Sequence, residues 1–475
     1  MEKWYTSKKE RTYYGLYFLG QNAVYTLTYM FLATYLLLCG LDAVATAGVL
    51  LLVKVWDAVN DCLFGGLIDK FHFKKGRFLP WLKISLPLII LSTALLFRIP
   101  QALGINQKLV FFAVAYILWD TAYTICDVPV FGLVTTMTDI QEERTSLMTT
   151  GRIYSNIGVL IALMAGYVLP SEAVGMSFSN IALVICLIAL VTMFFLCFRT
   201  KEHIETAERT EEYTLRGMFT YLLHNKYLFI YYGGQLLFGG LNTATTVLQF
   251  ACFYLFKNSL LSTVVAALAF VPSVIVAFFM PKILKKWDKF RVFYTSAAAY
   301  AALSVLIFFV GPRLVPQLII LTVRGIVFGA ITVLEFMFTP DCAEYGQYTT
   351  GIEAKGITFA IQTFTMKLVS AVSSVIAIAI LGLFGWQSVA AESFQELAAL
   401  NVPQTDLALK ALWGVFALVP ALGAVLAVLI WRRYDLRTPD VELMAKYNNG
   451  EIGREECEAY LSHPYAAGKK TGGAA

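Results

Sequence analysis

Charged residues are scarce in this chain, and their scarcity excludes most classes of soluble protein. Asp, Glu, Lys and Arg make up 15% of the 475 residues, whereas soluble globular domains carry about 25%. Hydrophobic residues make up 58%, so the few charges cannot cover a surface that faces water. Disordered, collagen-like and disulfide-scaffold classes are excluded for the same reason. A polytopic membrane protein remains, with most of its mass in lipid.

Metal-binding and redox motifs are also missing. The eight cysteines are scattered through apolar stretches without a CxxC pair, and we interpret them as small buried hydrophobic residues. The four histidines lie mostly in loops or in the tail, which gives a metalloenzyme little support. No nucleophile or cofactor constellation is visible. The chain is therefore not predicted to be an enzyme, and no cofactor is expected.

The net charge of +5 does not indicate nucleic-acid binding, because Lys and Arg form short tracts at the ends of apolar runs. Such tracts are topology signals, since loops rich in Lys and Arg stay in the cytoplasm. We therefore expect a multi-pass protein of the inner (plasma) membrane with both termini in the cytoplasm. In this orientation the external loops hold few basic residues, namely Arg98, Lys108, Lys257, Arg313 and Lys410.

Apolar runs long enough to cross a bilayer, about 20 residues each, recur along the whole chain. A polar segment at 199–225 divides them six and six. The sequence predicts an all-α membrane protein with twelve transmembrane helices in two six-helix bundles, at 1–198 and 226–433. A cytoplasmic central loop at 199–225 joins the bundles, and a cytoplasmic tail at 434–475 follows them. The expected spans are 13–38, 43–68, 81–98, 108–137, 147–169, 178–198, 226–255, 260–281, 292–311, 315–340, 356–384 and 408–431.

Ionisable residues inside these spans mark candidate sites, since each costs at least ~2.5–3.5 kcal/mol at mid-membrane. Lys54, Asp57 and Asp61 are three and four residues apart and share one helix face. Two carboxylates one turn apart repel unless a cation or protons lie between them, which favours a site for a hard monovalent cation. The alternative is an internal ion pair in which Lys54 neutralises Asp57.

A second group of candidates lies in the span 108–137. Asp120 and Asp127 share a helix face, and Thr124 adds a hydroxyl oxygen one turn before Asp127. Phe131, one turn beyond Asp127, has the shape to stack on a sugar ring, although core packing is the simpler explanation for it. Asp120 is alternatively a structural partner for a buried cation.

Two further spans carry a basic residue each. Arg152 lies one turn into the span 147–169, where its guanidinium suits carboxylates and sugar hydroxyls unless it only reaches back to the interface. Lys367 shares a helix face with Thr363, next to Gln362. A Lys at such depth must find an anion, so Lys367 is predicted to link the two halves through an aspartate of the first; the candidates are Asp57, Asp61 and Asp127.

Six short segments around these residues follow one another along the chain: WDAVND at 56–61, GGLIDK at 65–70, GRFLPW at 76–81, YTICDVP at 123–129, DCAEYGQY at 341–348 and QTFTMK at 362–367. Together, over about 10–435, the chain resembles the glycoside–pentoside–hexuronide:cation symporters. These are melibiose-permease-like members of the major facilitator superfamily. The resemblance implies two six-helix bundles, alternating access, and sugar uptake driven by Na⁺, Li⁺ or H⁺.

The resemblance also implies roles for individual residues. Asp57, Asp61 and Thr124 match the family's cation site and would bind Na⁺. The sugar pocket would comprise Asn22, Asp127, Phe131, Arg152, Gln362 and Thr363. An adjoining charge network would comprise Lys54, Asp120 and Lys367.

Two departures from the family bear on the substrate. Asn22 stands where melibiose permease has an acidic residue, and Phe131 stands where its pocket has a Trp. These changes argue against a simple α-galactoside, and the loss of an anion beside Arg152 and Lys367 favours an acidic sugar unless Asp120 restores the balance. The sequence therefore predicts a monomeric Na⁺-coupled sugar symporter that needs no cofactor. Its partners are a sugar, a monovalent cation and membrane lipid. The alternatives are an H⁺-coupled sugar symporter and a lysolipid transporter on the same scaffold.

Overall fold

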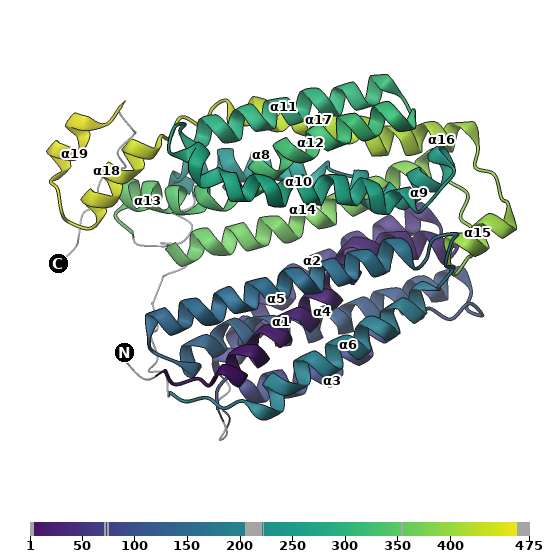
Figure 1. Cartoon of the computed structure of the whole chain (residues 1–475), viewed down its shortest axis with the longest axis horizontal. Coiled ribbons are helices and arrows are strands. Elements are labelled where there is room, and N and C mark those ends of the chain that lie inside the picture. The colour runs from purple at the N-terminus through teal and green to yellow at the C-terminus, as the bar shows by residue number, and fades with distance from the viewer. Residues whose placement is uncertain are drawn as a thin grey trace. The chain divides into compact units, whose positions relative to one another are not determined.

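A computed structural model of the chain describes residues 4–70, 73, 76–204, 221, 223–352 and 355–462 (Figure 1). Side chains of some helical residues are outside this description: 55, 58, 59 and 61–70, and 355–357, 359, 360 and 363. The described residues form no β-strand and only two isolated bridges. The helices of the first half are α1 (Lys8–Leu38), α2 (Ala43–Lys70), α3 (Leu79–Leu96), α4 (Ile105–Met137), α5 (Gln141–Val168) and α6 (Phe178–Arg199).

The second half of the chain is also helical. Its long helices are joined by short turns, and two small helices follow the last of them. They are α8 (Lys226–Gly240), α9 (Ala244–Phe256), α10 (Leu261–Leu284), α11 (Lys289–Val310), α12 (Leu314–Leu334), α13 (Phe338–Thr350), α14 (Lys355–Leu383), α15 (Phe394–Leu400), α16 (Asp406–Trp413), α17 (Val419–Trp431), α18 (Thr438–Asn448) and α19 (Arg454–Tyr460).

Ten helical segments among the described residues are long and apolar enough to cross a membrane. In addition, α1 and α2 contain 31 and 28 residues, and a span requires about 20. The all-α membrane architecture predicted from the sequence is therefore confirmed.

Three of the predicted spans are interrupted, and glycine or proline explains each interruption. The span 226–255 breaks between α8 and α9, directly after two glycines, which have the weakest helix propensity apart from proline. A 3₁₀ turn at Glu335–Met337 separates α12 from α13, and a π turn at Gly414–Leu418 separates α16 from α17. Pro340 and Pro420 follow these turns, and a proline clashes with the carbonyl four residues before it.

Contacts divide the chain into two compact units. Unit 1 comprises residues 1–209, 245–263 and 374–412, and unit 2 comprises residues 210–244, 264–373 and 413–475. In unit 1, α1 packs against both α5 and α6 (Figure 1), and α3 packs against α4 and α6. Glycines permit these close approaches: a Cβ atom on Gly158 would lie 2.2 Å from the main-chain oxygen of Leu19.

Segments from the second half of the chain close the Leu38 end of unit 1. Cys39 and Ala390 form an antiparallel bridge, and the Ala391 N–H donates to the Leu38 carbonyl at 2.8 Å. The Phe394 N–H likewise donates to the Pro170 carbonyl at 2.8 Å. These main-chain bonds fasten the segment before α15 to the ends of α1 and α5.

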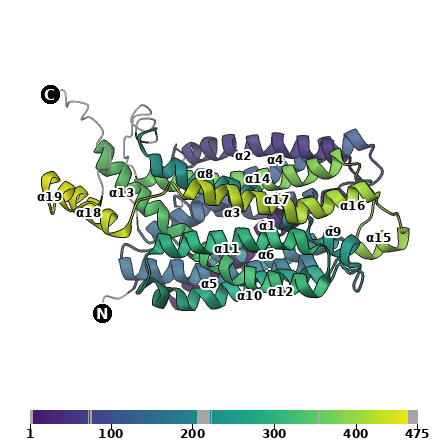
Figure 2. The ribbon, with the colours of Figure 1, turned by 90° about the horizontal axis from the view of Figure 1, so that it is seen from above.

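Unit 2 is built around an aromatic core between α8, α11, α12 and α17. Trp431 is fully buried in this core and donates from Nε1 to the Tyr231 carbonyl at 3.1 Å. Beyond the bundle, α18 packs on α13 (Figure 2). Met444 and Cys457 are fully buried there, so residues 434–462 of the expected tail are folded as part of unit 2.

Candidate functional site

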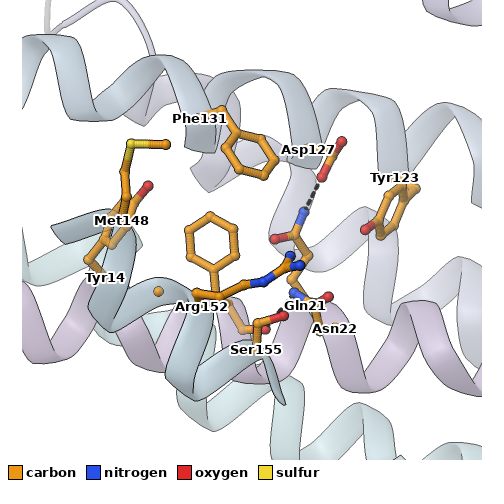
Figure 3. Close-up of a pocket in the computed structure, with 11 residues that line it drawn as sticks. Tyr14, Gln21, Asn22, Tyr123, Asp127, Phe131, Met148, Arg152 and Ser155 are labelled. Carbon is orange, nitrogen blue, oxygen red and sulfur yellow. Dashed lines mark hydrogen bonds between the residues drawn. The ribbon is translucent and has the colours of Figure 1, made fainter. Parts of the chain in front are cut away.

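A cavity of about 290 Å³ lies in unit 1 among α1, α4 and α5 (Figure 3). Its volume is close to the lower end of the range for small-ligand sites, about 300–1,000 Å³. Each of the three helices presents residues spaced three or four apart, so each contributes one face. The lining residues are Tyr14, Phe18, Gln21, Asn22, Tyr123, Asp127, Phe131, Met148, Gly151, Arg152 and Ser155.

Polar side chains gather at one side of this cavity. Gln21 donates from Nε2 to Asp127 Oδ1 at 2.7 Å. Asn22 donates from Nδ2 to the Phe18 carbonyl of its own helix at 2.9 Å, which leaves its Oδ1 to accept from a ligand. Arg152 extends from α5 toward Gln21 and Asn22 (Figure 3), and it forms no ion pair with any described residue.

Aromatic rings form another part of the lining. The rings of Phe18 and Phe131 meet edge to face at 5.3 Å between centroids, and those of Tyr14 and Phe18 lie 5.1 Å apart. Phe131 is 53% exposed, so it borders the cavity instead of filling a closed core. The cavity thus joins flat apolar faces to a carboxylate, two amides and a guanidinium.

Gln21 is a lining residue that the sequence analysis did not select. Its side chain is 2% exposed, and its Oε1 is buried without a hydrogen-bond donor among the described residues. A buried acceptor left unpaired costs about 1–3 kcal/mol, so a ligand hydroxyl that donates to this oxygen would remove the cost. The spacing of Tyr14, Phe18 and Gln21 along α1 was the only signal for this face in the sequence.

The first two residues of the predicted cation site form an ion pair. Lys54 Nζ lies 3.9 Å from Asp57 Oδ2 and 5.1 Å from the centroid of the Tyr116 ring. Asp57 is 6% exposed. The ion pair that the sequence offered as the alternative is therefore formed in this structure, while the side chain of Asp61 lies outside the described residues.

Asn60 connects the other polar residues of this region. It is fully buried, and its Nδ2 donates to Asp120 Oδ2 and to Thr124 Oγ1, both at 2.9 Å. The Thr124 hydroxyl in turn donates to the Asp120 carbonyl at 3.1 Å. Asn60 and Thr124 therefore join the second predicted span to Asp120 on α4.

The candidates of the second half lie on α14. Gln362 Oε1 is buried without a hydrogen-bond partner among the described residues, and Lys367 is half-buried. The side chain of Thr363 lies outside the description. This part of α14 belongs to unit 2, whereas the cavity belongs to unit 1. The ion pair between Lys367 and an aspartate of the first half therefore stays a prediction.

Residues 13–438 match a family model described as MFS/sugar transport protein. Over 429 residues the chain is 25% identical to the glucuronide carrier protein homolog of Escherichia coli (strain K12), covering 88% of this chain and 90% of that protein. It is 23% identical to the isoprimeverose transporter of Lactiplantibacillus pentosus, covering 79% and 81%. The solved structure of the nucleoside transporter NupG has a similar fold, with a TM-score of 0.63 and 12% identity over 90% of this chain and 100% of that one.

Proposed function

Because the chain belongs to the glycoside–pentoside–hexuronide:cation symporters among the MFS/sugar transport proteins, we propose that it couples the uptake of a sugar to a monovalent cation. Na⁺ is the first choice for that cation. Membership confirms the resemblance and the major facilitator fold that the sequence predicts. The protein is accordingly a membrane transporter. The sugar that it carries, its coupling ion and its orientation in the membrane are proposed.

The cavity of unit 1 is the observation that supports a sugar ligand. Sugar hydroxyls both donate and accept, and the Asp127 carboxylate accepts while the Arg152 guanidinium donates. The rings of Phe18 and Phe131 would cover an apolar face of the sugar ring. A lysolipid would require a largely apolar pocket, whereas one side of this cavity carries Gln21, Asn22, Asp127 and Arg152.

The position of Thr124 supports coupling between the two ligands. Thr124 and Asp127 are three residues apart on α4, so the proposed cation and sugar sites share one turn of the same helix. A cation that orders this turn would also fix Asp127 for the sugar. Coupling between binding sites is reciprocal, so the sugar should raise the affinity for the cation by the same factor.

A transport panel tests this proposal. The purified protein in proteoliposomes would be offered radiolabelled methyl glycosides, methyl glucuronide, isoprimeverose and a lysolipid, with a gradient of Na⁺, Li⁺ or H⁺. We expect Na⁺-stimulated uptake of at least one sugar. Uptake driven by a pH gradient alone would assign H⁺ as the coupling ion, and uptake of the lysolipid without any sugar would reject a sugar carrier.

Replacing Asp127 with Asn or Arg152 with Ala should weaken sugar binding. Each change removes a charge-assisted hydrogen bond worth about 1.5–3 kcal/mol, which corresponds to roughly 10- to 150-fold in the dissociation constant. Sugar binding at saturating Na⁺ would be measured for each variant. The exposed Glu142 lies on the same helix as Arg152, so Glu142→Gln is the control, and unchanged affinity in both pocket variants would remove these residues from the site.

Replacing Asn60 with Ala should weaken the response to Na⁺. The change removes the donor that joins Asp120 to Thr124, and a bond to a charged group is worth about 1.5–3 kcal/mol. The Na⁺ concentration for half-maximal uptake should rise about tenfold or more. Thr121→Ala is the matched control because its contact with Asn60 Oδ1 is long, at 3.5 Å; a normal Na⁺ response in Asn60→Ala would contradict the assignment.

A further inference from the structure

The carboxyl group of Glu335 lies at the break in the longest candidate span of unit 2. The 3₁₀ turn that begins with Glu335 interrupts the segment Leu314–Thr350. Six residues further along, Asp341 accepts from Nζ of Lys289, the first residue of α11, at 2.6 Å. Six residues of helix correspond to about 9 Å, so Glu335 lies about that far inside the span from the charged end marked by Lys289.

The surroundings of Glu335 are polar on one side only. Tyr231 donates from its hydroxyl to the Glu335 carbonyl at 2.5 Å, and Gln235 donates from Nε2 to the Tyr231 hydroxyl at 2.9 Å. The Gln235 amide also lies beside the Glu335 carboxyl group. Leu334 and Phe338 are fully buried, Glu335 is half-buried, and Phe336 and Met337 are 42% and 40% exposed.

No positive charge neutralises Glu335 among the described residues. On its own helix, Arg324 is held over the Tyr300 ring at 5.1 Å and donates to Ser304 at 3.5 Å. Lys289 is paired with Asp341, and none of the interactions of Glu335 involves Lys367 on α14.

Among the described residues, the other titratable groups near this turn carry hydroxyl or thiol side chains. Tyr231 and Tyr232 come from α8, and Cys342 of α13 interacts with both. Tyr232 is hydrogen-bonded to Thr339 at 2.6 Å. Among the described residues, the turn therefore offers hydroxyl and amide dipoles to Glu335 and no partner of full charge.

We propose that Glu335 is a proton-binding site of this transporter, separate from the cation site proposed on α2 and α4. An ionised carboxylate inside a span is costly unless it is paired, whereas a carboxylic acid is neutral and its carbonyl oxygen can still accept from the Gln235 amide. Only one O–H bond forms and breaks, with a proton taken from water and returned to it. The proposal does not depend on which sugar is carried or on the Na⁺ assignment.

Infrared titration of the purified protein tests the site without a sugar. A protonated carboxylic acid has a carbonyl stretch that is distinct from the carboxylate bands and shifts in D₂O. We expect such a band in the wild-type protein at neutral pH, its loss in Glu335→Gln, and its retention in Glu142→Gln. Its absence from the wild-type spectrum, or its persistence in Glu335→Gln, would overturn the proposal.

A second variant keeps the test informative if Glu335→Gln does not fold. Glu335→Asp keeps a carboxyl group at the turn, so the band should remain at a shifted position. In weakly buffered detergent solution with a pH-sensitive dye, wild-type protein and Glu335→Asp should release the proton of this site when the pH is raised above neutral, and Glu335→Gln should lose this release. Equal proton release in Glu335→Gln and the wild type would reject Glu335 as the site even if transport of the sugar panel were unchanged.

Discussion

Oxidation of an Ala390→Cys variant should arrest transport, because the new thiol would form a disulfide with the native Cys39. The two residues face each other in an antiparallel bridge, where opposed Cα atoms lie about 4.5–5.5 Å apart. Disulfides span Cα separations of about 4.4–6.8 Å, so the bridge meets the geometric requirement. By the predicted orientation this is the external end of unit 1, and alternating access would require it to open in every cycle.

The measurement is sugar uptake into proteoliposomes before and after oxidation, with the free thiols counted. We expect near-complete loss of uptake in oxidised Ala390→Cys and recovery after reduction. The control is Cys39→Ser combined with Ala390→Cys, which cannot form this disulfide, so its sugar uptake should not change on oxidation. If the cross-linked protein transported at the wild-type rate, the contact between residue 390 and α1 would not be part of a gate.

Unit 1 carries further bonds that would have to break with this bridge. Ser388 donates to the Leu41 carbonyl at 2.6 Å, and Gln249 donates to the Gly166 carbonyl at 2.9 Å. Each bond contributes about 0.5–1.5 kcal/mol, and a small number of them can be exchanged for bonds to water. The Leu38 end of unit 1 can therefore be stable when closed and still open at a modest cost in free energy. A disulfide at the same place would hold it closed until the disulfide is reduced.

The helices could be predicted from the sequence because apolar runs and bilayer thickness limit where a span begins and ends. The predicted span 178–198 and α6 at Phe178–Arg199 differ by one residue. The interruptions at Glu335–Met337 and Gly414–Leu418 were missed. Hydropathy does not register them, since Pro340 and Pro420 act through a missing N–H and a steric clash rather than through polarity.

The candidate site could be predicted only in part, for a related reason. Asp127, Phe131 and Arg152 were selected by their positions in the predicted spans and Asn22 by the family resemblance, and all four line one cavity. Gln21 was missed because its partner, Asp127, is 106 residues away on another helix. Spacing within a helix identifies neighbours such as Lys54 and Asp57, but it cannot identify contacts between helices.

Asp57→Asn should abolish Na⁺-driven accumulation and leave downhill exchange of the sugar intact. In this structure Lys54 Nζ lies 3.9 Å from the Asp57 carboxylate, so an arriving Na⁺ would compete with an ammonium for the same oxygens. Removing the carboxylate charge removes what attracts both cations. Sugar accumulation against a gradient, compared with exchange in the absence of a gradient, measures the effect, and Asp61→Asn is expected to behave in the same way.

Variants of Lys54 distinguish a cation site at Asp57 from a purely structural ion pair. If Lys54 competes with Na⁺, Lys54→Met should lower the Na⁺ concentration needed for half-maximal uptake, which is the opposite of the effect of Asp57→Asn. The double variant decides between the two explanations. A structural pair predicts that Lys54→Met restores accumulation to Asp57→Asn, since removing one partner of a buried pair is far costlier than removing both. A cation ligand predicts that the double variant stays inactive in accumulation, because a neutral amide at residue 57 cannot replace the carboxylate charge that holds Na⁺.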